Sequence, residues 1–418
     1  MMLKQGIQRL RTVAKNDGLD GIKRRLARKV VQRMNTRWNL AELDFPLRRS
    51  DVIDLSTYEI NTAVASESAR LKIGWVCIPP TIGSGGHTTF FRMVQSVIDA
   101  GHECTLVLYD RDNDDVARHE EALRTGWPWL TADIVGASQI DSSYDALIAS
   151  SWPTAHVVAS RAPQEMNCFY FVQDFEPYFY PRGYLYQLAE DSYRLGFHTI
   201  ALGGMVASEL ESSAGITPDV IVPFGCDRET YFRRTRPEGT PDRSGVVYYA
   251  RKDNDRRGYL LAKAVLERFH QLCPEQPIHL YGDEVSGWNI PIVNHGNLSP
   301  QQLNDLYNST IASLAMSFTN ISLVASELLA AGNVPVLNES ATARQDASYA
   351  VWAPPSPEAL AQALRSVVRA PDLERQAQQA ASQLPQSWSH TAKLTLREIE
   401  DHIARVVPRS EGLKGSVS

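Results

Sequence analysis

Basic residues and a glycine gather behind an apolar run in the second half of the chain. The run Val246–Ala250 ends at Arg251. Arg256 and Arg257 follow within one short loop, and a helical pattern starts after Gly258. Guanidinium groups beside the free N–H groups of a helix N-terminus favour a diphosphate. The spacing therefore predicts an anion site. The alternative is a solvated basic loop without a ligand.

Carboxylates leave a second apolar segment beside aromatic residues. Residues 168–172 are apolar, and Gln173, Asp174 and Glu176 follow them with Phe175 between. Acidic groups with an aromatic surface alongside are suited to hydrogen-bonding a ligand rich in hydroxyl groups. The alternatives are a helix-capping role for Asp174 and a surface position for Glu176.

A glycine-rich loop follows the first apolar strand of the chain. Gly83, Gly85 and Gly86 precede a helix that we expect to begin near Thr88. Glycine lets backbone N–H groups approach a ligand at the carboxyl end of a strand. The dinucleotide pattern G-x-G-x-x-G is not met, because Thr88 stands at its last glycine. A plain tight turn is the alternative. His87 suits a contact to a substrate hydroxyl, a helix cap or a packed ring equally well.

An alternation of strand and helix from Leu71 onward must position these segments. It predicts parallel sheets covered by helices on both faces. The predicted strands are Leu71–Ile78, Cys104–Tyr109, Tyr144–Ser150, Cys168–Val172, Thr199–Leu202, Val220–Pro223, Gly245–Ala250, Ile278–Tyr281, Ile311–Ala315 and Val334–Leu337. Ser299-Pro300 and Ser356-Pro357 each read as an N-cap followed by an N1 proline. A helix around Leu185 is expected to end at Gly196.

The predicted fold class is α/β, with two Rossmann-like, doubly wound domains facing each other across a cleft and a basic N-terminal helical arm. A chain of 418 residues supplies two cores of ordinary size. The polar, proline-rich stretch 233–244 is the expected linker between them. The expected parts are an arm at 1–69, an N-terminal domain at 70–235 and a C-terminal domain at 244–385.

Composition narrows the class of protein. The five cysteines stand at least 27 residues apart, which suits reduced core thiols better than disulfides or a zinc site. No apolar run is long enough to span a membrane, and the N-terminus lacks the apolar core of a signal peptide. We therefore expect a cytoplasmic protein.

Positive charge is concentrated at the N-terminus. Residues 1–40 carry a net charge of +9, and the remainder carries −15. Ile22, Leu26 and Val30 recur at helical spacing among these cations, so the arm can form an amphipathic helix for an anionic leaflet. A solvated extension is an equal alternative. Nucleic acid is not expected as a partner, because no aromatic interleaving or basic domain supports it.

The alternating domains and several motifs resemble the GT-B fold of family 4 retaining glycosyltransferases. Within residues 171–231 the chain looks like bacterial rhamnosyltransferases of the WsaF type. The motifs that carry this resemblance are Phe171–Pro177, Phe179–Pro181, Ala189–Phe197 and Pro223–Asp227. The resemblance covers roughly residues 70–400, everything except the basic arm. It also implies a C-terminal helix at 386–405 that crosses back to the N-terminal domain.

The resemblance assigns roles to individual residues. It implies catalytic roles for Asp174, Arg251, Arg256 and Glu327. Donor binding is implied for Gly85, Gly86, Arg251, Arg256, Arg257, Gly282, Asp283, Leu298, Ser322, Leu323 and Glu327. Acceptor binding is implied for His87, Thr88, Gln173, Asp174 and Glu176. No metal is expected. Two positions depart from the family pattern, since Gln173 stands where a histidine is common and Thr319 stands where a first glutamate is common.

Glu327 is expected to open a helix that faces the donor, and the resemblance implies that it bonds the ribose. Its alternative is a first-turn glutamate favoured by the helix dipole. The implied activity is transfer of L-rhamnose from dTDP-rhamnose to a cell-surface oligosaccharide or lipid-linked glycan, with retention and without a cofactor. Two alternatives share the fold: a nucleotide-sugar epimerase and a catalytically silent carbohydrate-binding protein. The arm would hold the transferase at the inner face of the cell membrane.

Overall fold

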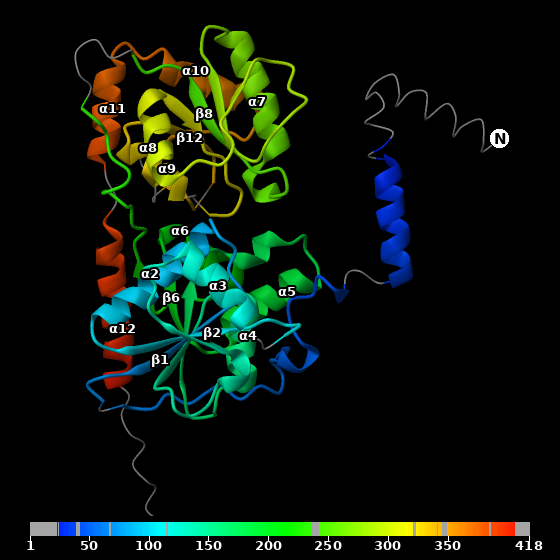
Figure 1. Ribbon diagram of the computed structural model, residues 1–418, viewed down its shortest axis with the longest axis vertical. Coiled ribbons are helices and arrows are strands. Elements are labelled where there is room, and N and C mark those ends of the chain that lie inside the picture. Colours follow the sequence, from blue (N-terminus) through cyan, green and yellow to red (C-terminus); the bar gives the residue numbers. More distant parts are fainter. Residues whose placement is uncertain are drawn as a thin grey trace, which may run out of the picture. The chain divides into compact units, whose positions relative to one another are not determined.

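The computed structural model describes residues 23, 25–38, 42–66, 68–113, 116–235, 242–320, 323–340, 342–344, 349–383 and 386–405 (Figure 1). The chain divides into two compact units, Met1–Ser50 and Asp51–Ser418. The sequence predictions for Ser322, for the middle of the linker and for residues 1–22 of the arm fall outside the described residues.

Residues 25–38 of the first unit form a helix, as predicted for the basic arm. Leu26, Val30, Met34 and Trp38 are all exposed along it. Since they are four residues apart, they share one side of the helix. In the described part of the chain, no helix has the length and apolar character needed to cross a bilayer.

Residues 51–66 belong to the second unit and not to the arm. The carboxylate of Asp51 is buried and accepts hydrogen bonds from Arg161, at 2.7 Å, and from the Tyr109 hydroxyl, at 2.8 Å. Thr62 exchanges backbone hydrogen bonds with Gln164 and Met166. The predicted arm boundary at residue 69 is therefore wrong. The folded body begins at Asp51, because a buried ion pair holds a segment that has no strand or helix pattern of its own.

The first domain is built on a parallel sheet in the order β3-β2-β1-β4-β5-β6-β7. Its strands are β1 Lys72–Cys77, β2 Glu103–Leu108, β3 Asp133–Gly136, β4 Ala146–Ala149, β5 Asn167–Val172, β6 His198–Leu202 and β7 Val220–Val222. Every residue of β4 and β5 is buried, which is expected when helices cover both faces of a parallel sheet. The sequence analysis missed only β3, an edge strand with little apolar signal.

The helices of the first domain are α2 Gly85–Asp99, α3 Ala117–Gly126, α4 Trp152–Arg161, α5 Tyr184–Asp191 and α6 Gly204–Glu209. α2 begins at Gly85, three residues earlier than predicted, because the side chain of Ser84 caps it by accepting from the N–H of His87. α5 ends at Asp191 and a 3-10 turn, Ser192–Arg194, continues toward Gly196.

The second domain is built on a parallel sheet in the order β10-β9-β8-β11-β12-β13. Its strands are β8 Val246–Ala250, β9 Ile278–Gly282, β10 Val293–Asn294, β11 Ala312–Leu314, β12 Val334–Asn338 and β13 Val351–Ala353. Its helices are α7 Tyr259–Leu272, α8 Pro300–Ser309, α9 Leu323–Ala330, α10 Pro357–Val368 and α11 Leu373–Ser382. Ser299 and Ser356 cap α8 and α10 as predicted. The short edge strands β10 and β13 were not predicted.

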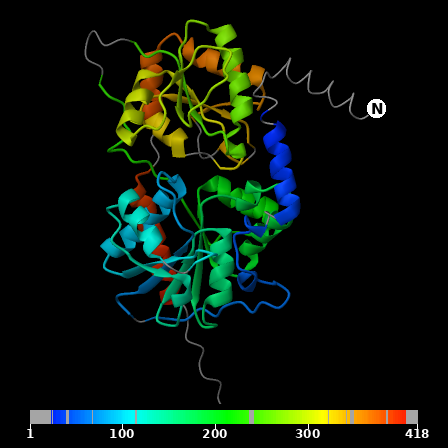
Figure 2. The ribbon, with the colours of Figure 1, turned by 45° about the vertical axis from the view of Figure 1, so that its right-hand side comes forward.

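The last helix, α12 (Trp388–Arg405), returns to the first domain and lies beside α2 (Figures 1 and 2). Trp388, Ala392, Ile399 and Ile403 are buried in the core of the first sheet. Two doubly wound α/β domains, the predicted fold class, are thus confirmed.

Candidate functional site

The predicted site segments meet at equivalent places on the two sheets. The strand order reverses between β1 and β4 in the first sheet and between β8 and β11 in the second. Ligands of open α/β sheets bind outside the carboxyl ends of the strands at such a reversal. The loop that contains Gly83, Gly85 and Gly86, here called the glycine loop, follows β1. The loop from Arg251 to Arg257, here called the arginine loop, follows β8, and a loop at 315–320 follows β11.

Side chains of the second domain contact the residues that follow β5 in the first domain. Arg256 Nη1 lies 3.3 Å from Asp174 Oδ2, and the Thr319 hydroxyl donates to the same oxygen at 3.1 Å. Asn320 Nδ2 donates to the carbonyl oxygen of Gln173 at 2.7 Å. We call these contacts among Gln173, Asp174, Arg256, Thr319 and Asn320 the polar clasp. They bring two predicted catalytic residues, Asp174 and Arg256, into direct contact.

The polar clasp is partly shielded from water. Burial raises the pKa of Asp174 to about 6, although Arg256, Arg257 and the Thr319 hydroxyl act in the opposite direction. The guanidinium of Arg256 also lies 3.8 Å from the centroid of the Phe179 ring. A carboxylate with a raised pKa and a stacked arginine in one cleft are frequent features of functional sites.

Arg257 lies on the other side of the arginine loop from Arg256. Its Nη1 donates to Ser317 Oγ at 3.1 Å, and its backbone carbonyl accepts from the Tyr248 hydroxyl at 3.2 Å. Burial lowers the pKa of Arg257. Two neighbouring arginines thus present one guanidinium to Asp174 and one to Ser317 in the loop after β11.

The glycine loop brings two helix N-termini together. Gly85 and Gly86 are exposed at the start of α2. A Cβ on Gly85 would lie 3.4 Å from Leu323 Cδ1, and Leu323 is the first residue of α9. A Cβ on Gly86 would lie 3.9 Å from Gln173 Oε1. Helix N-termini carry free N–H groups and partial positive charge, so this junction favours an anion.

His87 and Thr88 are engaged within the first domain. His87 Nδ1 lies 2.9 Å from Ser84 Oγ, its ring packs beside Phe91, and burial lowers its pKa. Thr88 Oγ1 donates to the carbonyl of Ser84 and accepts from Trp127 Nε1. Both residues therefore hold the glycine loop in shape, whatever contact they make with an acceptor.

Glu176 is buried and caps a helix. Its Oε2 accepts from the backbone N–H of Trp152, the first residue of α4, at 2.6 Å. Burial raises the pKa of Glu176 to about 8 despite that hydrogen bond, and the nearby Asp174 raises it further. The alternative of a surface position for Glu176 is therefore wrong. The residue is buried and has a structural partner in the N-terminus of α4.

Arg251 lies apart from the polar clasp at the ends of β8 and β9. Its Nη1 is 3.4 Å from Asp283 Oδ1, and its side chain is 46% exposed. Gly282 has a φ of +98°, and a Cβ there would lie 2.6 Å from the carbonyl oxygen of Ala250. Only glycine fits this approach. Leu298 packs against the inner core of the second domain.

Glu327 is the fifth residue of α9 and not part of its first turn, so the predicted helix-opening position is wrong. The helix already begins at Leu323. Burial raises the pKa of Glu327 to about 7, while Arg92 lowers it and Asp227 raises it. Arg92 and Asp227 are themselves an ion pair at 3.4 Å. The charges that act on Glu327 therefore come from Arg92 of α2 and from Asp227, which follows β7. Neither Arg251 nor Arg256 is among them.

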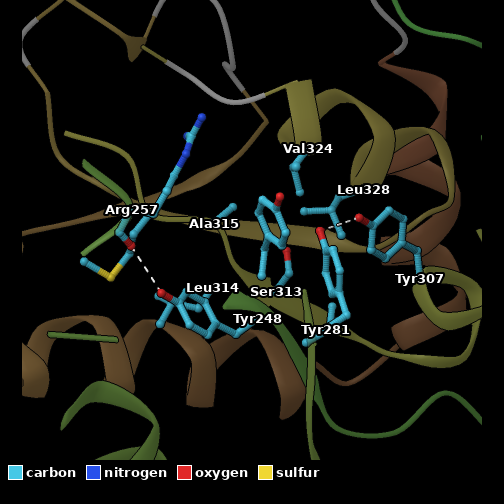
Figure 3. A pocket seen from close by; sticks show the side chains of 12 residues that line it. Tyr248, Arg257, Tyr281, Tyr307, Ser313, Leu314, Ala315, Val324 and Leu328 are labelled. Carbon is cyan, nitrogen blue, oxygen red and sulfur yellow. Dashed lines mark hydrogen bonds between the residues drawn. The ribbon is translucent and has the colours of Figure 1, made fainter. Parts of the chain in front are cut away.

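A pocket rich in tyrosine lies at the reversal between β8 and β11 (Figure 3). Tyr249 of β8 stacks on Tyr281 of β9 with ring centroids 4.9 Å apart. The Tyr281 and Tyr307 hydroxyls are 2.7 Å apart, and Arg257 lines the same pocket. We call this the tyrosine pocket. The pocket holds only about 20 Å³, room for one water molecule, so a nucleoside would contact its mouth and not enter it.

Several residues of the site were not identified by the sequence analysis. Thr319 entered it only as the place of a missing glutamate, yet its hydroxyl bonds Asp174. Asn320 and Arg92 stood in no motif, and Phe179 and Asp227 stood in motifs without an assigned role. Among the described residues, no group of three or more His, Cys, Asp or Glu side chains is arranged to hold a metal ion.

Comparisons with known proteins place the fold. No family model matches the chain. It is 28% identical over 244 residues to the O-antigen biosynthesis protein RfbC of Myxococcus xanthus, and the match covers 54% of this chain but only 18% of that protein. The crystal structure of WaaG, a glycosyltransferase involved in lipopolysaccharide biosynthesis, matches with a TM-score of 0.55 and 13% identity over 78% of this chain and 99% of WaaG.

HepE of Anabaena, solved in complex with UDP-glucose, matches with a TM-score of 0.55 and 15% identity, covering 80% of this chain and 98% of HepE. Identities this low establish the fold and leave the activity to be argued from the site. The chain therefore has the two-domain fold of GT-B glycosyltransferases.

Proposed function

We propose that this protein is a nucleotide-sugar-dependent glycosyltransferase of surface polysaccharide synthesis. Its donor is dTDP-L-rhamnose, its acceptor is an oligosaccharide or lipid-linked glycan, and the anomeric configuration is retained. The observation that carries the proposal is the meeting of Asp174 and Arg256 where both sheets reverse their strand order. The similarity to RfbC and the fold shared with WaaG and HepE support the same class of reaction.

The cationic groups of the site match the charge that develops during such a transfer. As the bond from the anomeric carbon to the diphosphate breaks, negative charge grows on the diphosphate. Arg256 and Arg257, with the N-termini of α2 and α9, would stabilise that charge. The acceptor hydroxyl attacks the anomeric carbon from the side of the leaving group, and its proton passes to the leaving phosphate oxygen. No protein nucleophile and no metal ion is required.

Two partly buried carboxylates would position the donor. Asp174, when ionised, accepts hydrogen bonds from sugar hydroxyl groups beside Arg256. Glu327 lies near Tyr231, Tyr281 and Tyr307, whose pKa values it raises, and it would accept from the ribose of a nucleoside held at the mouth of the tyrosine pocket. The assignment of rhamnose rests on the motifs of residues 171–231 and on Thr319, which offers a sugar one acceptor fewer than a glutamate.

Calorimetric titration tests the donor assignment. Full-length protein is titrated with dTDP-L-rhamnose and with UDP-glucose, beside Arg256→Ala and the control Arg268→Ala. Arg268 is an exposed arginine of the same domain that pairs with Glu358. We expect dTDP-L-rhamnose to bind the wild type and Arg268→Ala, and to lose at least tenfold in affinity for Arg256→Ala. Equal binding to all three proteins would contradict the proposed site.

The fate of the donor separates transfer from the alternative activities. A transferase releases dTDP only as sugar appears on an acceptor, apart from slow hydrolysis. An epimerase converts the sugar nucleotide without any acceptor, and a binding protein leaves it unchanged. Radiolabelled dTDP-L-rhamnose with a membrane and polysaccharide extract as acceptor is the probe. Acceptor-independent conversion of the donor would overturn the transferase assignment.

The arm helix at 25–38 would hold the enzyme at the inner face of the cell membrane, where lipid-linked acceptors reside. Leu26, Val30, Met34 and Trp38 form its exposed apolar side. The exposed cations Arg28, Lys29, Arg33 and Arg37 fall largely on the remaining arc of the helix. An apolar stripe flanked by cations favours a surface of anionic lipid.

Vesicle sedimentation tests this membrane assignment. We expect the full-length protein to sediment with phosphatidylglycerol vesicles and not with phosphatidylcholine vesicles at low salt. The double substitution Leu26→Glu and Val30→Glu should abolish binding. Gln32→Glu, on the polar side of the same helix, should reduce it only slightly. Equal sedimentation of the wild type and the double variant would identify the arm as a solvated extension.

A further inference from the structure

Arg92 of α2 is held between two segments that are remote in the sequence. Its Nη2 lies 3.4 Å from Asp227 Oδ2, in the segment that follows β7. Its guanidinium also lies 5.4 Å from the centroid of the Trp388 ring, at the start of α12. An anion on one side and an aromatic ring on the other restrict the movement of the cation. Arg92 is therefore a positioned cation, although no motif indicated it.

The carboxylate that holds Arg92 is itself fixed. Asp227 Oδ2 accepts from the Thr230 hydroxyl at 3.0 Å, and its Oδ1 accepts from the N–H of Thr230 at 3.3 Å. The carbonyl of Asp227 accepts from the N–H of Tyr231 at 2.8 Å, which closes the turn. Asp227 thus has a local structure that keeps it beside Arg92.

This ion pair lies beside Glu327 of the second domain. Cys226, which precedes Asp227, directs its thiol at the carbonyl oxygen of Ser326, 3.8 Å away, and Ser326 precedes Glu327. The chain segments that carry Asp227 and Glu327 are therefore in contact. Arg92 and Asp227 are also the two charged residues that act on the Glu327 carboxyl group.

The other titratable groups that face Glu327 carry no charge near neutral pH. Burial raises the pKa of each of them, from three different elements: Cys226, Tyr231, Tyr281 and Tyr307. Burial also favours the neutral acid of Glu327, and Arg92 is the cation that opposes this effect. An ionised carboxylate accepts a stronger hydrogen bond from a hydroxyl group than a neutral carboxyl does.

We propose that Arg92 is a positioning residue of the transferase, which keeps the Glu327 carboxylate charged so that it accepts from the ribose of the donor. Asp227 and Trp388 hold Arg92 in place for this purpose. A cation of the first domain thereby controls how the second domain binds the nucleoside. This inference rests on the proposed function.

The experiment measures nucleotide binding as a function of pH. Calorimetry follows the affinity for dTDP on both sides of about pH 7 in the wild type, Arg92→Met, Arg92→Lys, Asp227→Asn and Glu327→Gln. UDP replaces dTDP if the wild type prefers uridine nucleotides. The titration of the nucleotide itself is common to all proteins, so each curve is compared with that of Glu327→Gln. Arg397→Met, which removes an exposed arginine of α12, is the control.

We expect the wild type to lose affinity below about pH 7 and Glu327→Gln to lack this decrease. Arg92→Met removes the cation that favours the charged form, so the decrease should move up by about one pH unit. Asp227→Asn removes the opposing anion and should move it down. Arg92→Lys keeps the charge and should restore the wild-type curve. A merely structural role would lower the affinity equally at every pH.

The double variant Arg92→Met with Glu327→Gln shows whether Arg92 acts through Glu327. It should follow the pH curve of Glu327→Gln alone. If the wild type binds dTDP but the curves of Arg92→Met and Asp227→Asn do not move relative to Arg397→Met, the inference is overturned and the proposed donor site stands. If the wild type binds no nucleotide of either series, both proposals fall. Should Arg92→Met prove unstable, the opposite shift in Asp227→Asn decides.

Discussion

Two of the places that join the two domains differ in character. One is the polar clasp, where Arg256, Thr319 and Asn320 reach the end of β5. The other is the crossover, where the chain leaves β7 and returns into α12. There Cys226 donates its N–H to the carbonyl of Gln386, and Gly225 lies against Trp388 so closely that a Cβ would be 2.5 Å from its ring.

This difference indicates which contact can respond to a ligand. The crossover is held by backbone hydrogen bonds and tight packing around a buried tryptophan, which no diffusing molecule can replace. The clasp depends on one ion pair and two hydrogen bonds, and an incoming diphosphate competes with Asp174 for Arg256. We infer that the crossover is a fixed joint and that the clasp exchanges partners when donor binds.

Removing the clasp arginine should have the largest effect. Arg256→Ala deletes the cation beside Asp174 and leaves that carboxylate buried without its ion pair. We expect kcat/KM for the donor to fall by about 100- to 1,000-fold, as for loss of one charge-stabilising donor. Release of dTDP under steady-state conditions measures it, with Arg268→Ala as control. A fall smaller than tenfold would mean that the diphosphate does not lie at the clasp.

Widening the crossover should reduce stability and leave the clasp chemistry intact. Gly225→Ala places its Cβ about as close to the Trp388 backbone as to the ring, at 2.7 Å, so the helix must shift. We expect a loss of about 1–3 kcal/mol in the free energy of unfolding. Urea denaturation measures it. Gly183→Ala is the control, because its nearest contact is an ordinary 3.7 Å.

Acid should weaken the clasp at a defined pH. Asp174 must be ionised to hold Arg256, so kcat/KM should fall about tenfold per pH unit below about pH 6, where its carboxylate becomes protonated. A limb near pH 7 that disappears in Glu327→Gln would instead identify Glu327 as the limiting group. The pH profile of the wild type, Asp174→Asn and Glu327→Gln distinguishes the two.

The same pKa predicts the opposite trend for stability. Because the folded pKa of Asp174 exceeds its unfolded value, its contribution to stability is complete below about pH 4 and is lost as the pH rises through about 6. Asp174→Asn should therefore melt no lower than the wild type at pH 7.5. A lower melting temperature would show that the ion pair with Arg256 outweighs the burial of the carboxylate.

The sequence predicted the strands and loops that carry the site better than the contacts between its side chains. Buried parallel strands are long apolar runs, so β1, β5 and β8 and the loops behind them were found. A contact such as Asp174 with Thr319 joins residues that no periodicity relates, because the reversal of strand order in each sheet brings them together. Asp51 was missed for the same reason. Its place in the fold depends on Arg161 and Tyr109, which are remote in sequence.

Arg251 provides the smallest effect and the sharpest comparison with Arg256. Both were predicted to grip the donor, yet Arg251 is 46% exposed and pairs with Asp283 of its own domain. Water screens such a cation, and its ion pair contributes little. We therefore expect Arg251→Ala to raise KM for the donor about two- to tenfold with kcat almost unchanged, whereas Arg256→Ala lowers kcat. If Arg251→Ala lowers kcat as much, the diphosphate lies nearer the end of β8, and the clasp organises the domains without taking part in the transfer.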